Sequence, residues 1–250
     1  MLSQLAAAGK VKKVFSHCFD TRKGGAIFAV GSVVQPTVRM TTLVPHTLHY
    51  SMNLTSIDVA GSTLQLPNST FAGEVKGTII DAGTRLSYLP EVVYKNTMNA
   101  VFYNQPNTVF YDFQDFLCFQ FSGRVDEAFP TITFHFNGDL ASSMHPHDYL
   151  LHNGSDLYCM GLQNGKSLHD DKKDTLILGD VSLSDKLVVY DLEKQVVGWT
   201  DYNCFSSIKI MDEQTGSAYD VHAHRIFSQG GHCHVPVLLS MFLLLGSYLI

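Results

Sequence analysis

Short apolar runs separated by turn-forming residues recur along most of the chain. Residues 131–136 alternate strictly between polar and apolar side chains, which is typical of a strand with one buried face. The other runs are bounded by Gly, Pro, Asn or Asp, and they occupy residues 26–30, 50–59, 157–162, 176–178, 187–190 and 196–199. These patterns predict a mainly β protein with strands at the listed positions.

One stretch has the features of a helix. It covers residues 90–101, with Pro90 in the first turn and Glu91 where the helix dipole favours an acidic side chain. Because no other segment carries comparable signals, we expect few and short helices.

The regular pattern ends after Cys204. Residues 205–234 are polar, with scattered histidines at 222, 224, 232 and 234. These histidines lack regularly spaced carboxylate or cysteine partners, and the pair His145 and His147 lacks them too. We therefore expect no metal site and interpret residues 205–227 as a flexible polar stalk.

The C-terminus has the pattern of a lipid-attachment signal. Residues 235–250 are apolar throughout, and small residues precede them around Ser217 and Ser228. A small site, a polar spacer and a terminal apolar tail together predict a GPI signal, here residues 228–250, with Ser228 or Ser217 as the attachment residue. A single membrane-spanning anchor is the alternative.

The N-terminus and the glycosylation sequons also indicate whether the protein is secreted. Residues 1–10 are too interrupted to form the apolar core of a signal peptide, so we expect the chain to be a piece of a longer secreted protein. Three glycosylation sequons lie at Asn53, Asn68 and Asn153. Asn68 and Asn153 lie in turn-like stretches, whereas Asn53 lies in an expected strand. The predicted location is the extracellular face of the plasma membrane.

Composition and charge exclude some partners. The chain has 250 residues, 45% of them hydrophobic. Its net charge is −6, and the sequence contains no basic run suited to binding nucleic acid. The five cysteines are too scattered for a zinc site. If Cys233 is removed with the tail, four remain for two disulfides, and spacing leaves three pairings open.

The stretch from residue 77 to residue 90 carries the candidate chemistry. A buried apolar strand leads directly into Asp81, followed by Ala82, Gly83 and Thr84. Glycine permits a tight turn below the carboxylate, and the threonine hydroxyl is able to orient it by a hydrogen bond. Taken alone, an Asp-x-Gly-Thr sequence indicates only a turn.

The surrounding residues make this stretch resemble the second active-site motif of pepsin-like aspartic peptidases, in the form found in plants. The motif residues are 79–84 and 86–90, and residues 176–180 are similar to the partner strand of that family. Further similar strands lie at residues 14–19, 24–28, 50–61, 187–191 and 197–199. The resemblance implies that residues 1–204 form the C-terminal lobe of the pepsin-like bilobal fold. It also implies disulfides Cys118–Cys159 and Cys18–Cys204.

In that family, two aspartates share one proton and activate a water molecule. The resemblance implies that Asp81 is one of them, supported by the loop residues Ala82, Gly83 and Thr84. No second Asp-Thr-Gly or Asp-Ser-Gly occurs in the chain, and Ala82 replaces the usual Ser or Thr. Asp139, Asp148, Asp180 and Asp191 lie outside the motif and are interpreted as structural.

We therefore expect one lobe of an aspartic-type endopeptidase that acts on proteins or peptides, needs no cofactor, and requires a separate N-terminal lobe for activity. Two alternatives stay open. One is a non-catalytic, protein-binding relative on the same scaffold. The other is a pair of identical lobes related by a two-fold axis, so that Asp81 meets its counterpart.

Overall fold

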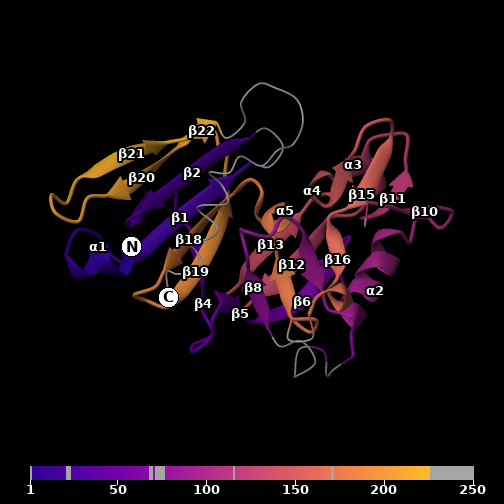
Figure 1. Cartoon of the computed structure of the whole chain (residues 1–250), viewed down its shortest axis with the longest axis horizontal. Coiled ribbons are helices and arrows are strands. Elements are labelled where there is room, and N and C mark those ends of the chain that lie inside the picture. Colours follow the sequence, from indigo (N-terminus) through magenta and orange to yellow (C-terminus); the bar gives the residue numbers. More distant parts are fainter. Residues whose placement is uncertain are drawn as a thin grey trace. The chain divides into compact units, whose positions relative to one another are not determined.

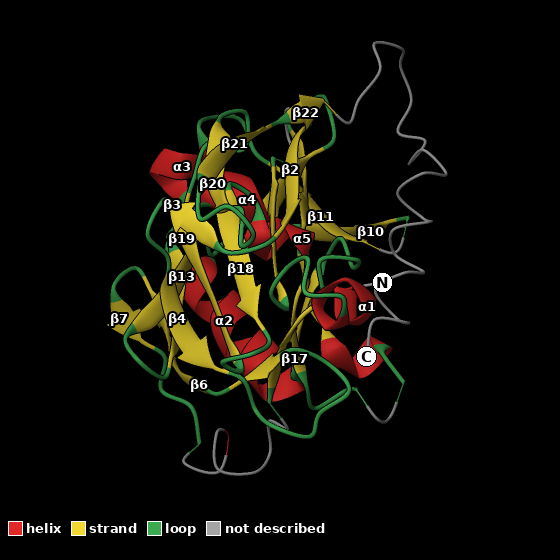
Figure 2. Cartoon of the chain, turned by 90° about the vertical axis from the view of Figure 1, so that its left-hand side faces the viewer, coloured by secondary structure: helices red, strands yellow, loops and turns green. Residues whose placement is uncertain are grey.

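The computed structural model describes residues 2–20, 24–67, 70, 77–114, 116–169 and 172–225. The chain divides into two compact units: unit 1 comprises residues 1–48 and 183–250, and unit 2 comprises residues 49–182. Strands predominate in both units, as Figures 1 and 2 show. The prediction of a mainly β protein is therefore confirmed.

Unit 1 contains a six-stranded antiparallel sheet of order β22-β2-β1-β18-β19-β4. Its central strand β18 is buried along its whole length, and β1 is buried at four of its six residues, including the polar Ser16 and His17. The strands are β1 (Val14–Phe19), β2 (Gly25–Val30), β4 (Arg39–Thr42), β18 (Lys186–Asp191), β19 (Val196–Asp201) and β22 (His224–Arg225).

A second sheet of unit 1 has the order β21-β20-β3. Its strands are β3 (Val33–Gln35), β20 (Ser207–Met211) and β21 (Ala218–His222). Ile208 and Ile210 of β20 are fully buried in a core that also contains Cys18, Leu187 and Val189.

The prediction of a flexible stalk at residues 205–227 is therefore wrong for the part that the structure describes. Ile208 and Ile210 alternate with polar residues, so one face of β20 is apolar and becomes buried on folding. The alternating segment of β20 is short and lies among polar and histidine-rich residues, so its two-residue periodicity is not evident in the sequence. Residues 226–227 and the predicted GPI signal at 228–250 lie outside the described residues.

Unit 2 contains a mixed five-stranded sheet of order β16-β9-β17-β8-β5, in which β8 and β17 are parallel neighbours. Its strands are β5 (Ser51–Met52), β8 (Thr78–Ile80), β9 (Ser87–Leu89), β16 (Leu162–Asn164) and β17 (Leu176–Leu178). Strands β8 and β17 are completely buried, in agreement with their mostly apolar sequences, Thr-Ile-Ile and Leu-Ile-Leu. This sheet carries the Asp81 stretch.

Two four-stranded antiparallel sheets complete unit 2. The order of one is β13-β12-β6-β7, and that of the other is β10-β11-β15-β14. Their strands are β6 (Leu54–Val59), β7 (Ser62–Thr63), β10 (Phe110–Phe113), β11 (Phe116–Gln120), β12 (Ile132–Phe136), β13 (Leu140–Met144), β14 (Leu150–His152) and β15 (Leu157–Met160). The strands predicted at residues 131–136 and 157–162 are present, the latter divided between β15 and β16.

The predicted helix is α2 (Glu91–Val101), which begins after Pro90 and buries Val93, Thr97 and Val101 at four-residue spacing. The remaining helices are short: α1 (Leu2–Ala7), α3 (Val125–Ala128), α4 (Pro146–Tyr149), α5 (Asp180–Leu183) and η2 (Gly165–Ser167). Within the described residues, no helix has the length and apolar character needed to cross a membrane.

Within the described residues, each unit contains one disulfide. Cys18–Cys204 lies in unit 1 with a Cα–Cα distance of 5.3 Å, and Cys118–Cys159 lies in unit 2 at 4.0 Å. This is the pairing that the family resemblance implied. In the chain-entropy model, closing loops of this length stabilises the fold by roughly 3 to 5 kcal/mol each.

Candidate active site

Asp81 directly follows the buried strand β8. Its backbone N–H donates to the carbonyl of Leu178 at the end of β17, at 3.0 Å. The preceding N–H, that of Ile80, donates to the carbonyl of Tyr50 at 3.1 Å. Because the strand is paired on both sides, by β17 and by β5, the backbone at Asp81 is firmly positioned.

Two neighbours hold the Asp81 carboxylate. Its Oδ1 accepts a hydrogen bond from the backbone N–H of Gly83 at 3.1 Å, and its Oδ2 accepts one from the Thr84 hydroxyl at 2.8 Å. The Thr84 N–H also donates to the Asp81 carbonyl at 3.0 Å, which closes the turn. The half-buried carboxylate is thus oriented by both residues that the motif singled out, while free lone pairs remain for other donors.

Ala82 lies between Asp81 and Gly83 and is half-buried. Its methyl group offers no hydrogen bond, in contrast to a hydroxyl side chain at the same position. The Asp81 loop, defined here as residues 81–86, therefore has one hydrogen-bonding group fewer than the family motif provides.

Backbone contacts from the segment after β17 support the Asp81 loop. Asp180 N–H donates to the Thr84 carbonyl at 2.7 Å, and Val181 N–H donates to the Arg85 carbonyl at 3.0 Å. A Cβ atom at Gly179 would overlap the Leu86 carbonyl and lie 2.6 Å from the Thr84 carbonyl oxygen. Only glycine therefore allows the two backbone segments to approach this closely.

A buried pair of serines adds to this support, and sequence reasoning missed it. Ser87 Oγ accepts a hydrogen bond from Gly179 N–H at 3.0 Å and shares a short hydrogen bond with Ser182 Oγ. Ser182 Oγ also contacts Met144 Sδ at 3.2 Å. The two serines are 95 positions apart, and neither belongs to a recognisable motif, so the sequence held no signal for their contact.

Asp180 is an acid with unusual properties beside the loop. Its Oδ1 is buried, and no hydrogen-bond partner for it occurs among the described residues. Burial raises the pKa of Asp180 to about 7, against the opposing effect of the Arg85 charge. Asp180 therefore keeps its proton well above the pH at which an exposed aspartate ionises.

The other predicted site residues are dispersed. Asn53 is exposed in the gap between β5 and β6, so its expected place inside a strand is wrong. Asn153 is exposed outside strands, and Asn68 lies outside the described residues. Ser217 is exposed in the turn between β20 and β21, so cleavage there would remove β21 from its sheet. Ser228 lies outside the described residues. The exposed sequons are compatible with glycosylation, and the position of Ser217 is unfavourable for lipid attachment.

Metal ligands do not cluster in the described part of the chain, where no group of three or more His, Cys, Asp and Glu is arranged around a common point. His145 and His147 stack with ring centroids 5.6 Å apart. His147 Nδ1 lies 2.8 Å from Oδ1 of Asp126, an ordinary surface ion pair or hydrogen bond.

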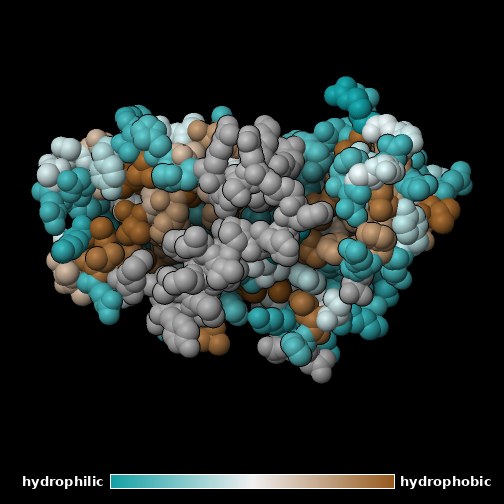
Figure 3. Space-filling view, turned by 45° about the horizontal axis from the view of Figure 1, so that its top comes forward, coloured by the Kyte–Doolittle hydropathy of each residue, from teal (hydrophilic) through white to brown (hydrophobic). Residues whose placement is uncertain are grey.

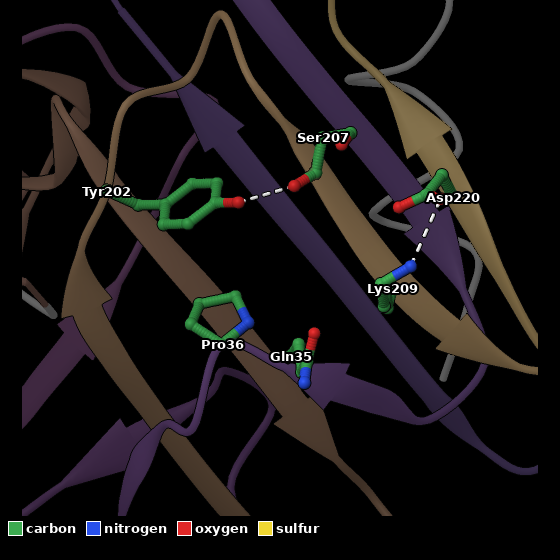
Figure 4. Close-up of a pocket in the computed structure, with 6 residues that line it drawn as sticks. All are labelled: Gln35, Pro36, Tyr202, Ser207, Lys209 and Asp220. Carbon is green, nitrogen blue, oxygen red and sulfur yellow. Dashed lines mark hydrogen bonds and ion pairs between the residues drawn. The ribbon is translucent and has the colours of Figure 1, made fainter.

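A pocket of about 350 Å³ lies on the small sheet of unit 1 (Figure 4). An ion pair crosses it, with Lys209 Nζ 3.1 Å from Asp220 Oδ2, and the Tyr202 hydroxyl donates to the Ser207 carbonyl. Gln35 and Pro36 complete the lining. None of these residues belongs to the Asp81 loop.

Comparison with known proteins agrees with the geometry. A family model described as xylanase inhibitor C-terminal matches residues 49–201. Aspartic proteinase 39 from Arabidopsis thaliana is 46% identical over 228 residues, and Aspartic proteinase 36 from the same plant is 44% identical over 229. Each alignment covers 91% of this chain but 47% of the relative. The chain thus spans about half the length of these relatives.

A solved structure shares the fold. Basic 7S globulin from soybean superposes with a TM-score of 0.62 at 20% sequence identity. The superposition covers 82% of this chain and 54% of the globulin.

Proposed function

Since this chain belongs to the xylanase inhibitor C-terminal family, as the C-terminal lobe of a pepsin-like aspartic peptidase fold, we propose that Asp81 is one of two catalytic carboxylates of an endopeptidase. The observation that carries the proposal is the fixed Asp81 carboxylate, which accepts hydrogen bonds from Gly83 and Thr84 at the end of a buried strand. An aspartate that served only to form a turn would not require Gly179 and the serine pair behind it.

The proposed chemistry needs a second carboxylate close to Asp81. Two such groups share one proton, because two like charges at hydrogen-bonding distance do not both ionise. The ionised carboxylate removes a proton from a bound water, and the protonated one donates to the carbonyl oxygen of the scissile peptide. Water attacks the carbonyl carbon, and the nitrogen of the leaving amine takes up a proton as the C–N bond breaks.

A companion N-terminal lobe is proposed to supply the second carboxylate. The relatives named aspartic proteinases are about twice as long as this chain, which leaves room for such a lobe. The chain by itself is accordingly proposed to hydrolyse no peptide bond.

Ala82 favours a second candidate function, a non-catalytic protein that binds other proteins on the same scaffold. A hydroxyl at this position would be available for a hydrogen bond to the companion lobe, worth on the order of 1 kcal/mol. The family description as a xylanase inhibitor agrees with a binding role among relatives.

A chimera distinguishes the two candidates. The chain is joined to the N-terminal half of Aspartic proteinase 39, and cleavage of a denatured protein is measured at acidic pH with a transition-state-mimicking inhibitor as probe. We expect the chimera to cleave the protein and to bind the inhibitor, whereas the chain alone does neither.

The Ala82→Ser variant of the chimera is the matched control. If the chimera is folded yet inactive and Ala82→Ser restores cleavage, this chain is the non-catalytic relative. If both are folded and neither cleaves the substrate nor binds the inhibitor, the assignment of Asp81 to catalysis is refuted.

We further propose that the protein passes through the secretory pathway and is held at the outer membrane face by a GPI anchor. The two disulfides and the exposed Asn53 and Asn153 support this location. When the chain is expressed in plant cells behind a secretion signal, phosphatidylinositol-specific phospholipase C should release it from membranes, and Asn153→Gln should remove one glycan mass. Membrane retention after the phospholipase treatment would contradict the anchor.

A further inference from the structure

Exposed large apolar side chains gather in one short segment of unit 2. Eight such side chains are exposed among the described residues, and four of them lie within residues 103–113. They are Tyr103 at 80% exposure, Val109 at 75%, and Tyr111 and Phe113 at 38% each. The others are dispersed along the sequence, so among the described residues this segment is the largest sequence-local concentration of exposed apolar surface.

The segment includes the edge strand β10. Within the part of the chain that the structure describes, β10 of the sheet β10-β11-β15-β14 is paired on one side only, with β11. Alternate residues of an antiparallel edge strand direct their N–H and C=O groups away from the sheet, which makes such an edge a template for another strand. Hydrophobic side chains reach the surface on the right-hand side of Figure 3, the side on which Figure 1 places β10.

Aromatic packing holds β10 in place. The Phe110 ring makes edge contacts with Phe102 of the α2 C-cap at 4.8 Å and with Phe119 of β11 at 5.8 Å, measured between centroids. Tyr111 and Phe113 point to the opposite face, because neighbouring strand residues alternate. The edge is therefore preformed, with two aromatic rings available on one face.

A small cavity adjoins the strand. Its volume is about 210 Å³, and its lining combines the apolar residues Met98, Phe102, Pro106 and Phe110 with the polar residues Asn99, Gln105 and Thr108. A cavity of this size suits a single apolar side chain rather than a drug-sized ligand. We call residues 98–113, with this cavity, the β10 edge.

The net charge of unit 2 indicates which kind of peptide segment the β10 edge would bind. Unit 2 contains 7 Lys and Arg and 15 Asp and Glu, a net charge of −8, whereas unit 1 contains 10 and 8, a net charge of +2. Asp112 is the only charged residue within residues 98–113, and it is exposed. A basic segment is therefore favoured over an acidic one and over an anionic membrane surface.

We propose that the β10 edge binds an extended, basic segment of a partner protein, which adds to the sheet as a further strand and inserts one apolar side chain into the cavity. Backbone hydrogen bonds along β10 supply affinity, while the cavity and Asp112 supply specificity. The proposal does not depend on Asp81, and it holds for a catalytic or a non-catalytic protein.

A peptide selection tests this proposal. A library of random nine-residue peptides is selected on the full immobilised chain. We expect enrichment of Lys or Arg alternating with apolar residues. A synthetic enriched peptide should bind at least tenfold more weakly to Tyr111→Ser/Phe113→Ser and to Asp112→Lys.

Tyr219→Ser is the matched control, because Tyr219 is 49% exposed on β21, which is likewise an edge strand. Circular dichroism checks that each variant is folded, and Val109→Ser replaces the double variant if that one unfolds. The proposal fails if no peptide is enriched, if enriched peptides are acidic, or if Tyr219→Ser weakens binding equally. It also fails if the β10 variants instead abolish self-association or binding to anionic vesicles while peptide binding persists.

Discussion

In unit 2, the Asp81 loop is held by backbone hydrogen bonds, among them Asp81 N–H to the Leu178 carbonyl and Asp180 N–H to the Thr84 carbonyl. In unit 1, the β20–β21 hairpin is held by apolar side chains, with Ile208 and Ile210 buried against the Cys18–Cys204 disulfide region. The loop keeps the Asp81 carboxylate half-buried, whereas the hairpin buries the side chains of Ile208 and Ile210. Changes to side chains should therefore affect activity in the first region and stability in the second.

The largest expected effect is that of Asp81→Asn in the chimera with the companion lobe. Loss of the ionisable group should reduce kcat by a factor on the order of 10³, because water is no longer activated. The free energy of unfolding should change by less than about 1 kcal/mol, since asparagine keeps a hydrogen-bonding oxygen. Asp139→Asn, at an exposed turn residue with φ of 57°, is the control and should leave both quantities unchanged. Equal activity of Asp81→Asn and wild type would exclude the proposed role.

Gly179→Ala tests whether the region around the Asp81 loop also governs stability, through the backbone segment that packs against the loop. The added Cβ overlaps the Leu86 carbonyl, so the two segments must separate at a cost on the order of 4 kcal/mol. Gly61→Ala meets open space at φ of 74° and should cost only about 1 kcal/mol. Chemical denaturation measures both, and similar midpoints for the two variants would show that the close approach is not required.

Ile210→Ala tests the hairpin. Removing a fully buried side chain from the unit 1 core should cost about 3 kcal/mol. Lys209→Ala, next to it on the opposite face, removes a surface ion pair with Asp220 and should cost less than about 1 kcal/mol. Kinetic constants of the chimera should be unaffected by either. A negligible loss for Ile210→Ala would mean that residues 205–225 are a loosely attached stalk after all.

Asp180 predicts a pH dependence in unit 2. Burial raises its folded pKa from 3.8 to about 7, so between these values the folded state binds more protons than the unfolded state. Its contribution to stability is therefore fully present below about pH 4 and is lost as the pH rises through 7. Urea unfolding at several pH values should show this decline in the wild type and a flatter profile in Asp180→Asn. Identical profiles would contradict the assignment.

His17 predicts the opposite dependence in unit 1. Its Nε2 lies 3.1 Å from the Tyr190 hydroxyl, and burial lowers its pKa from 6.5 to about 4. Between these values the unfolded state binds more protons, so stability should fall as the pH decreases from 6.5 towards 4. His17→Gln should remove this acid-induced loss, as measured by urea unfolding at pH 4.5 and 7. An unchanged loss would assign the acid sensitivity to other groups.

The local sequence was sufficient for most of the strands and for the loop. The alternation at residues 131–136 and the apolar triplet at 176–178 predicted β12 and β17 at nearly the observed bounds. The spacing of Asp81, Gly83 and Thr84 placed three groups that interact within one turn, so their contacts were visible in the sequence. The family resemblance further implied both disulfides, which spacing alone left open.

By itself, then, the sequence determined the strand-rich class, helix α2 and the candidate carboxylate, because these depend on residues a few positions apart. The tertiary structure alone decided that β20 packs into the core of unit 1, that Ser87 meets Ser182, that Oδ1 of Asp180 is buried, and that β10 is an edge. Burial and sheet order arise when residues distant in the sequence come together. Such properties belong to the assembled chain, and no local pattern of residues encodes them.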